Sequence, residues 1–502
     1  MEGKTVILNG KDLTLEDFIA VVRDREKVEI SKESMELLKR ARKVVFEMAE
    51  EGVPVYGLNR GVGWNKDKTV FKDFFQQYNK NLIYAHCVAV GPEMNEEDVR
   101  AVMLARLNTF LVGCAGIQPE LALMYKEFLN HGIHPVIPER GSVGEADIAN
   151  LSHVGLAMIG EGEVLYNGMR MSAKEAINKV GLEPAVLGPK DGLAIVSSNA
   201  LAAGPGALAI KEISDIIDIA NIIYSMSLEG LKGNVAPIGE KINKMRRFEG
   251  QNYCAEKIRS YLKGSYLWDP ATTRPLQDPL SYRCASAVHG AVKDSLEYTC
   301  ENLMIHLNTT EDNPCLLVDE RKMITSCNFE PTTWVLGFEM LGSGLNHLSK
   351  MSCHRTIKLA DPAFTGLSRF LTPAEGDTIA YGTIQKSFTS LATEINHLSN
   401  PATADFFPVA GNIEDHANNS PFVVRKTRQI VDNLRYILGI EMLHAVQAID
   451  LRKGIKLGNG TKAIYDVVRE IIPFLDKDRN LTLDIKKAYE IIKSGKLLDL
   501  VQ

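Results

Sequence analysis

The sequence predicts a mainly α-helical protein built around a bundle of long helices. Apolar residues recur at helical spacing through most of the second half of the chain, at residues 281–307, 332–360, 383–399 and 421–453. Few helix breakers interrupt these stretches, and the last three stop at or just before Pro362, Pro401 and Gly454. Runs of β-prone residues are few and short. We therefore expect an N-terminal domain at residues 1–200, followed by a central helical bundle and C-terminal helices at residues 201–502.

The shorter elements have recognisable start and stop residues. Thr14 begins a capping box for a short helix, and Ser31 can cap a longer helix that stops at Gly52. Residues 5–8 and 163–166 are β-prone and predict small peripheral hairpins. Ser420 before Pro421 fits the N-cap and first position of the last long helix. Residues 462–502 predict shorter amphipathic helices around a polar turn at residues 476–480.

Composition excludes several functional classes. The chain has 502 residues, 45% of them hydrophobic, and a formal net charge of -6. Without a block of like charges, neither a nucleic-acid surface nor a basic membrane patch is expected. No uncharged apolar run reaches the roughly 18 residues that a membrane span needs. A small-molecule substrate is therefore expected, with no nucleic-acid or membrane partner.

The cysteines and the first residues bear on the cellular compartment. The eight cysteines form no Cys-x-x-Cys pair and no zinc-type cluster with histidine, so no metal site is predicted and the thiols are expected to be reduced. The apolar run at residues 5–8 is too short for the core of a signal peptide. These features predict a cytoplasmic protein.

Seven polar or glycine-rich segments lie between the predicted helices or at their ends. They lie at residues 56–63, 81–86, 141–147, 277–284, 311–314, 327–329 and 412–416. In this order and at these separations, over nearly the whole chain, they resemble the histidine and phenylalanine ammonia-lyase family. The resemblance implies an ammonia-lyase/fumarase-like fold, with a long central helical bundle in a homotetramer. It also implies active sites that each draw residues from three subunits.

The resemblance also assigns roles to individual residues. Tyr56 matches the family's catalytic base, and Arg283 matches its carboxylate-binding arginine. His86 and Glu414 match groups that face the imidazole ring in the histidine-specific branch, and Phe329 matches an aromatic wall. Outside the family context, each of the five would be interpreted as a structural residue.

One segment departs from the family pattern. Family members cyclise an Ala-Ser-Gly unit into a methylidene-imidazolone electrophile, whereas here Gly144 is followed by Glu145, Ala146 and Asp147. There is no serine to dehydrate and no glycine nitrogen to close the ring, so no cofactor is predicted. Ser197 begins the segment that replaces the family's Asn-Gly-Thr, which is a further change around the missing electrophile.

Other departures predict new roles in the pocket. Lys386 stands where the family has an apolar or aromatic residue, and with Glu414 we expect it to act as an acid and ring-binding pair; the alternative is a solvated lysine. Glu330 and Arg60 replace a histidine and a threonine, and both are expected to bind substrate. Trp64 is a candidate wall for a cation, or a core residue.

These changes predict the reaction. The family electrophile bonds to a primary amine, but a trimethylammonium nitrogen has no lone pair and can leave as a neutral tertiary amine. We therefore expect elimination of trimethylamine from a histidine-derived betaine, with ergothioneine giving thiourocanate preferred over trimethylhistidine. A phenolate at Tyr56 would need a lowered pKa, for which Arg60 and Arg283 are the expected cause.

Two other functions remain open. One is a histidine-like ammonia-lyase, an aminomutase or another betaine lyase. The other, from a different class, is a catalytically silent tetrameric binding protein, in which the pocket residues would tolerate substitution.

Overall fold

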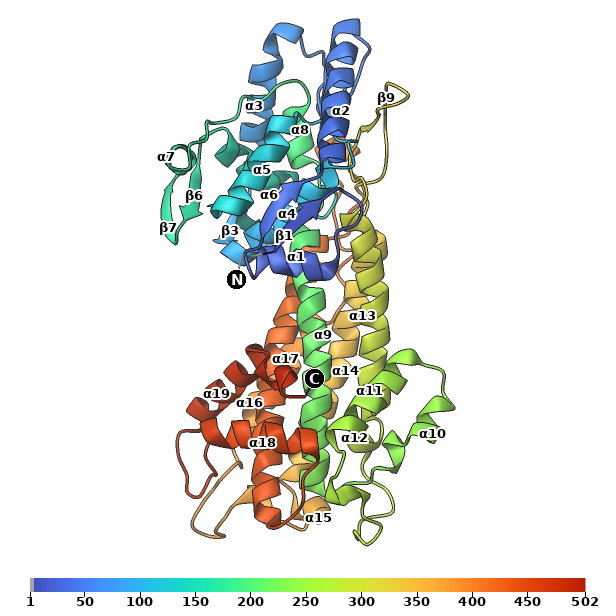
Figure 1. Ribbon diagram of the computed structural model, residues 1–502, viewed down its shortest axis with the longest axis vertical. Helices are drawn as coiled ribbons and strands as arrows, with labels where there is room; N and C mark the ends of the chain where they lie inside the picture. The colour runs from blue at the N-terminus through green and yellow to red at the C-terminus, as the bar shows by residue number, and fades with distance from the viewer. Residues whose placement is uncertain (1–3, 502) are drawn as a thin grey trace. The chain divides into compact units, whose positions relative to one another are not determined.

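A computed structural model describes residues 4–501, so Met1–Gly3 and Gln502 lie outside the described residues. The chain is mainly helical, as predicted (Figure 1). It packs as two compact units, each made of three segments. Unit 1 comprises Met1–Ala209, Thr299–Leu336 and Pro401–Arg425, and unit 2 comprises Ile210–Tyr298, Gly337–Asn400 and Lys426–Gln502. Both units are thus discontinuous along the chain. The two continuous domains expected at residues 1–200 and 201–502 stay a prediction.

Unit 1 begins with the capped helices that the sequence predicts. Thr14 accepts a hydrogen bond from the amide of Asp17 at the start of α1 (Leu15–Val22), and Ser31 does the same for Ser34 at the start of α2 (Lys32–Glu51). Helix α2 ends at Gly52, whose φ of 73° is left-handed. The other helices wholly within this unit are α3 (Phe75–His86), α4 (Glu96–Phe110), α5 (Pro119–His131), α6 (Ile148–Met158), α7 (Ala173–Lys179) and α8 (Asp191–Val196).

Small sheets accompany these helices. The hairpin prediction is confirmed for β6 (Glu163–Tyr166), which turns through Asn167-Gly168 into β7 (Met169–Ser172) and also pairs with β4 (Ile133–Pro135). It is wrong for β1 (Thr5–Leu8), which pairs in parallel with β2 (Lys27–Ile30) because α1 lies between the two strands in the chain. Two further antiparallel pairs are β3 (Val90–Glu93) with β5 (Pro138–Arg140), and β8 (Cys315–Leu317) with β9 (Lys322–Ile324).

Four long helices each contribute residues to both units. They are α9 (Ala200–Leu231), α13 (Ala285–Leu307), α14 (Thr332–Leu359) and α17 (Ser420–Arg452). The predicted stretch at 281–307 breaks at Cys284 into α12 (Leu280–Arg283) and α13. The last long helix begins one residue earlier than predicted, at Ser420, and the side chain of Asn418 accepts the amide hydrogen of Ser420.

Within unit 2, buried polar contacts join these helices. Arg355 of α14 donates to both carboxylate oxygens of Glu441 of α17, at 2.5 and 2.9 Å. His289 of α13 contacts Asn221 of α9 at 2.8 Å through its Nδ1. Such pairs stabilise one register of the bundle because either charge left alone in the core would cost several kcal/mol. The predicted central bundle is therefore present.

The remaining helices of unit 2 are shorter. They are α10 (Glu240–Lys244), α11 (Glu249–Tyr261), α15 (Pro362–Thr365), α16 (Gln385–Leu398), α18 (Asn459–Ile471), α19 (Leu481–Lys493) and α20 (Lys496–Asp499). Short 3-10 helices lie at Gly63–Asn65, Lys72–Phe74, Ala236–Ile238, Tyr266–Trp268, Arg369–Leu371 and Ala410–Asn412. The predicted polar turn separates α18 from α19.

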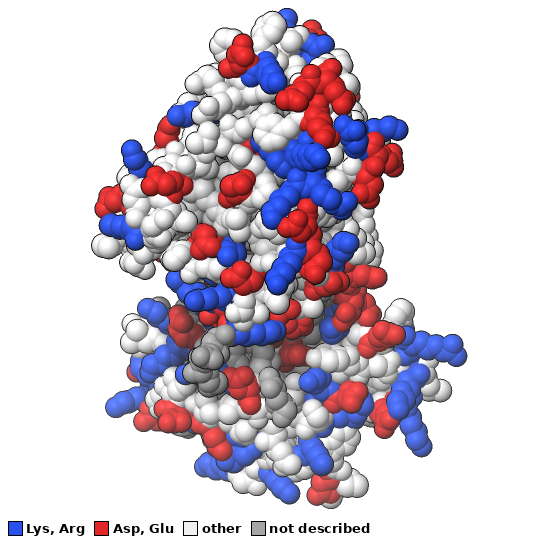
Figure 2. Space-filling view, turned by 45° about the horizontal axis from the view of Figure 1, so that its top comes forward, with Lys and Arg blue, Asp and Glu red and all other residues white. Residues whose placement is uncertain are grey.

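One helical stretch among residues 4–501, Asp191–Leu231, is long and apolar enough to cross a bilayer. All of its most apolar window is buried inside the protein, as in the core helix of a globular protein. The face shown in Figure 2 carries acidic and basic side chains intermixed.

Candidate active site

A cavity of about 640 Å³ in unit 1 gathers most of the predicted site residues, and its size suits a small-molecule ligand. Those that line it are Tyr56, His86, Ser197, Phe329, Glu330 and Glu414. The other lining residues are Val62, Gly63, Asn65, Leu82, Glu145, Ala146, Ile148, Leu193, Val196, Asn313, Cys327, Ala410, Ile413, Asp415 and His416.

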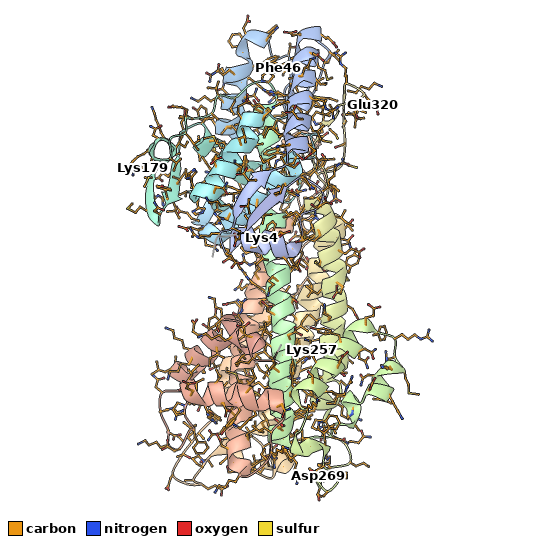
Figure 3. All side chains as sticks on the ribbon, viewed as in Figure 1. Lys4, Phe46, Lys179, Lys257, Asp269 and Glu320 are labelled. Carbon is orange, nitrogen blue, oxygen red and sulfur yellow. The ribbon has the colours of Figure 1, made fainter. Side chains whose placement is uncertain are left out.

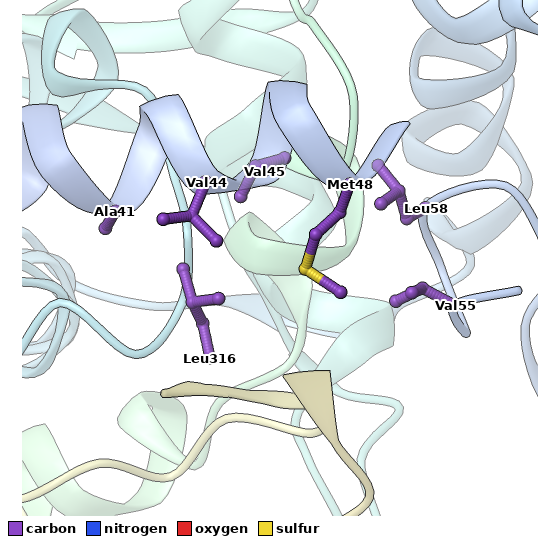
Figure 4. Close-up of a cluster of buried hydrophobic side chains, with 7 residues drawn as sticks. All are labelled: Ala41, Val44, Val45, Met48, Val55, Leu58 and Leu316. Atoms are coloured by element: carbon purple, nitrogen blue, oxygen red, sulfur yellow. The ribbon is translucent and has the colours of Figure 1, made fainter. Parts of the chain in front are cut away.

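Tyr56 lies between two apolar residues, Val55 and Leu58, that anchor its loop. Val55 and Leu58 belong to a buried cluster with four residues of α2 and Leu316 (Figure 4). Beyond them, the chain turns back so that the amide of Gly63 donates a 2.7 Å hydrogen bond to the Tyr56 hydroxyl oxygen. Gly63 has a φ of 55°, which glycine adopts more readily than other residues. The loop therefore points an N–H group at the oxygen that would act as a base.

The electrostatic setting of Tyr56 differs from the expectation. Burial raises the pKa of its phenol, the Gly63 hydrogen bond opposes this rise, and the charge of Glu414 adds to it. Arg60 does not supply the expected counter-charge, because its guanidinium donates to the hydroxyl of Thr69 and does not line the cavity. Within this chain, the backbone amide is thus the group that favours the phenolate.

His86 and Ser197 reach the cavity from the ends of helices. The Nδ1 atom of His86, the last residue of α3, lies 2.7 Å from the carbonyl oxygen of Leu82. Since a carbonyl only accepts, Nδ1 carries the hydrogen and Nε2 of the neutral ring is an acceptor. Ser197 follows α8, which Asn79 of α3 fixes by accepting the amide hydrogen of Gly192 at 2.8 Å.

The loop that replaces the family electrophile is held as ordinary peptide. The amide of Ala146 donates to the Asn199 side chain at 3.1 Å, and that of Asp147 donates to the carbonyl of Ser198 at 2.6 Å. With the amides of Ala146 and Asp147 engaged and no serine at residues 145–147, this segment does not fit the methylidene-imidazolone group.

A buried charge network holds the start of α9 beside this loop. Glu311 accepts hydrogen bonds from Ser198 at 2.5 Å, from the amide of Asn199 at 2.8 Å and from Arg106 at 3.1 Å. Burial alone would raise the pKa of Glu311, but hydrogen bonding and charge from His306, followed by the charge of Arg106, lower it to about 2. Glu311 of the segment at residues 311–314 therefore supports the site, while Asn313 of the same segment lines the cavity.

The sequence motifs point to Glu330 but not to Glu145, the second carboxylate that lies beside it in the cavity. The Oε1 atoms of Glu145 and Glu330 both accept from the side-chain nitrogen of Asn418, at 2.8 and 3.1 Å. The Nε2 atom of His416 lies 3.7 Å from Glu145 and 3.4 Å from Glu330. Burial, followed by the charge of Glu330, raises the pKa of Glu145 to about 8. For Glu330, burial is outweighed by hydrogen bonds from Thr332, His416 and Asn418, which lower its pKa.

Four predicted site residues do not line this cavity. Trp64 is 70% exposed, and its ring packs against Gly411. Arg60 is engaged with Thr69, as described above. Arg283 and Lys386 belong to unit 2, where Arg283 donates to Gln277 and Lys386 is exposed on α16. Their roles toward a substrate stay predictions.

The lining of the cavity is acidic. Glu145, Glu330, Glu414 and Asp415 contribute carboxylates, whereas no Lys or Arg of residues 4–501 lines it. Its other ionisable groups, within the described part of the chain, are His86, His416, Tyr56 and Cys327. Such a lining favours a ligand that carries positive charge.

Comparison with known proteins identifies the family. The family model for aromatic amino acid lyases matches residues 13–470. The chain belongs to the aromatic amino acid lyase family. A histidine ammonia-lyase of Alkaliphilus metalliredigens is 35% identical, over 99% of both chains. Another from Treponema denticola is 36% identical, over 100% of this chain and 99% of that one.

Among solved structures, an ergothionase of Treponema denticola has a TM-score of 0.96 and 53% identity, covering 99% of this chain and 100% of that one. That enzyme degrades ergothioneine, and it was solved with desmethyl-ergothioneine sulfonic acid. The histidine ammonia-lyase of Trypanosoma cruzi has a TM-score of 0.92 and 28% identity, covering 99% and 95%. The ammonia-lyase-like fold predicted from the motifs is thus confirmed.

Proposed function

We propose that this protein is a carbon-nitrogen lyase that eliminates trimethylamine from ergothioneine to give thiourocanate. The observation that carries the proposal is an acidic cavity that contains Tyr56 and the ring-facing residues His86 and Glu414, next to a loop without the residues of the family electrophile. The comparisons support this choice over amine chemistry. The chain is 53% identical to the ergothionase of Treponema denticola, but 36% identical to a histidine ammonia-lyase of the same organism.

The reaction needs a base and a leaving group that departs with its electrons. Tyr56, as the phenolate, takes the β proton, and the electrons of that C–H bond form the new double bond. The C–N bond breaks with its electron pair on nitrogen, so trimethylamine leaves neutral and later takes a proton from water. The Gly63 amide stabilises the phenolate form of Tyr56 by donating to its oxygen.

The other roles follow from the ring and the carboxylate of the substrate. Glu414 and His86 face the thioimidazole ring from the cavity wall. His86 contacts the ring through its acceptor Nε2, and Glu414 belongs to the acid pair that stabilises charge developing on the ring. We assign Lys386 to the same task as an acid, and Arg283 to the substrate carboxylate. Both residues reach the site from partner subunits of a homotetramer in this proposal, and the protein acts in the cytoplasm.

Product analysis tests the proposal. The purified protein is incubated with ergothioneine, and trimethylamine is measured together with the near-ultraviolet absorbance of the conjugated acid. Equal amounts of both products are expected. Release of ammonia from histidine, with no trimethylamine from ergothioneine, would overturn the proposal in favour of an ordinary ammonia-lyase. Trimethylamine from trimethylhistidine alone would make the protein another betaine lyase.

A further inference from the structure

We infer that Glu145, supported by Glu330, binds the trimethylammonium group of the substrate and is the residue that selects a quaternary nitrogen. The inference deepens the proposed function and rests on it for the identity of the substrate. The site is the cavity described above, and Glu145 is one of its walls.

The geometry leaves one oxygen of Glu145 free to meet a ligand. Its Oε1 atom accepts from Asn418, while Oε2 accepts no hydrogen bond from residues 4–501. The side chain as a whole is only 12% exposed, so the carboxylate lies in a largely desolvated setting. A carboxylate in such a place attracts a cation more strongly than one on the surface does.

The groups around Glu145 and Glu330 indicate which kind of cation the site prefers. A primary ammonium would need acceptors around its three N–H groups, whereas a quaternary nitrogen has none and interacts through charge and apolar contact alone. Phe329 and Ile413 also line the cavity and offer surface for methyl groups. The free oxygen of Glu145, together with the apolar residues of the same cavity, suits the quaternary cation.

The arrangement is a poor metal site, although Glu145, Glu330 and His416 lie close enough to be considered as ligands. The side-chain nitrogen of Asn418 donates to the same Oε1 atoms that would bind an ion. Its orientation is fixed, because its Oδ1 atom accepts the amide hydrogen of Ser420 at 3.0 Å. The N–H hydrogens of Asn418 therefore compete with a metal ion for both Oε1 atoms.

Charge explains why binding should depend on pH. The charged groups near Glu145 are Asp147 on its own loop, Glu330 after β9 and His416 before α17, and Glu414 lines the same cavity. Burial, then the charge of Glu330, raises the pKa of Glu145 to about 8, so the free protein holds a proton there below that pH. A bound cation favours the ionised carboxylate. Affinity should therefore fall as pH drops from 9 to 7, with a proton released on binding.

Binding of tetramethylammonium, measured by calorimetry on the intact assembly, tests the inference without turnover. Glu145→Gln should weaken its affinity about tenfold, which corresponds to about 1.4 kcal/mol, and should remove the pH dependence. Glu145→Asp keeps the charge and should retain most of the affinity. Glu320→Gln alters an exposed carboxylate in the turn between β8 and β9, labelled in Figure 3, and should change nothing. Neutral tert-butanol should bind equally to all four proteins.

The outcomes separate this inference from the proposed function. Wild-type affinity for tetramethylammonium in Glu145→Gln, or tight binding of Mn²⁺ that displaces tetramethylammonium and needs Glu145, would overturn the inference. If the wild-type protein releases no trimethylamine from ergothioneine yet loses tetramethylammonium binding in Glu145→Gln, the cation site stands and the proposed reaction fails. If Glu145→Gln turns over ergothioneine with unchanged KM, the reaction stands and the cation site fails.

Discussion

At Tyr56, partial burial raises the pKa of the phenol and the hydrogen bond from the Gly63 amide lowers it. Replacing Tyr56 by phenylalanine removes that oxygen while keeping the ring that fills the space between the loop and the cavity. We expect kcat for trimethylamine release to fall by about 10²- to 10⁴-fold, the usual contribution of a general base. Binding of the substrate, measured by calorimetry, should stay within about threefold. Unchanged turnover would remove Tyr56 from the role of base.

The pH profile should separate Tyr56 from Glu145. A base acts when deprotonated, and burial raises the pKa of Tyr56, so kcat should rise with pH into the alkaline range. KM should fall over the same range as Glu145, with its pKa of about 8, loses its proton. Initial rates from pH 6.5 to 9.5 measure both effects. A kcat that declines above neutrality would contradict the assignment of Tyr56.

Sequence spacing identified single residues better than their partners. Tyr56, His86 and Glu414 lie in the cavity as the family motifs implied, and their roles stay predictions. The meeting of Glu145 and Asn418 could not be predicted, because the two are 273 residues apart and neither belongs to a family motif for that contact. Lys386 shows a different limit. Ile384 just before its helix and Phe388 within it are buried, but the lysine itself is exposed in the chain.

At the scale of elements, the loop at residues 141–147 depends on a glycine. A Cβ atom on Gly144 would lie 2.3 Å from Oδ1 of Asn418, and its φ of 93° is left-handed. Gly144→Ala should therefore lower the free energy of unfolding by about 2 to 4 kcal/mol and raise KM through displacement of Glu145. Gly168→Ala is the control, since Gly168 also has a positive φ but open space around it. Urea unfolding of both variants measures the difference, and equal losses would disprove the close contact.

The start of α9 depends on Glu311. Glu311→Gln leaves the fully buried Arg106 with one carboxylate partner fewer, which should cost about 3 kcal/mol. The pKa of Glu311 is held at about 2, below its ordinary 4.5, so its stabilising effect is complete above pH 4.5 and is lost as pH falls toward 2. Denaturant curves at pH 7 and pH 4 should show a smaller gap between variant and wild type at the lower pH. An equal gap would exclude ionisation of Glu311 as the cause.

Local rules explain why the helices were predictable and some strands were not. Thr14 and Ser31 cap their helices through side-chain contacts three residues away, which the sequence displays directly. The parallel pairing of β1 with β2 depends on the path of the chain after Leu8, so its short β-prone sequence alone does not distinguish it from a hairpin. The helix break at Cys284, between α12 and α13, likewise could not be predicted, because no proline or glycine marks it.

At the scale of the whole molecule, Lys386 allows a test of whether each active site is shared between subunits. If each active site combines Tyr56 of one subunit with Lys386 of another, then co-expressed Tyr56→Phe and Lys386→Met chains that mix at random should regain about a quarter of wild-type activity. Each variant alone should be nearly inactive. Mass measurement of the mixed complex checks that the two chains have combined. No recovery in a mixed tetramer would mean that one chain supplies both residues.

The hydrogen bonds from Ala146 and Asp147 to Asn199 and Ser198 bear on the evolutionary history of this branch. An amide already committed to a carbonyl is a poor nucleophile, so restoring alanine, serine and glycine at these positions would not by itself regenerate a self-processing site. Return to deamination of primary amines would require a different set of backbone hydrogen bonds in this loop as well as new side chains. Selection that acts on one substitution at a time would have to make both changes before either one restores the activity.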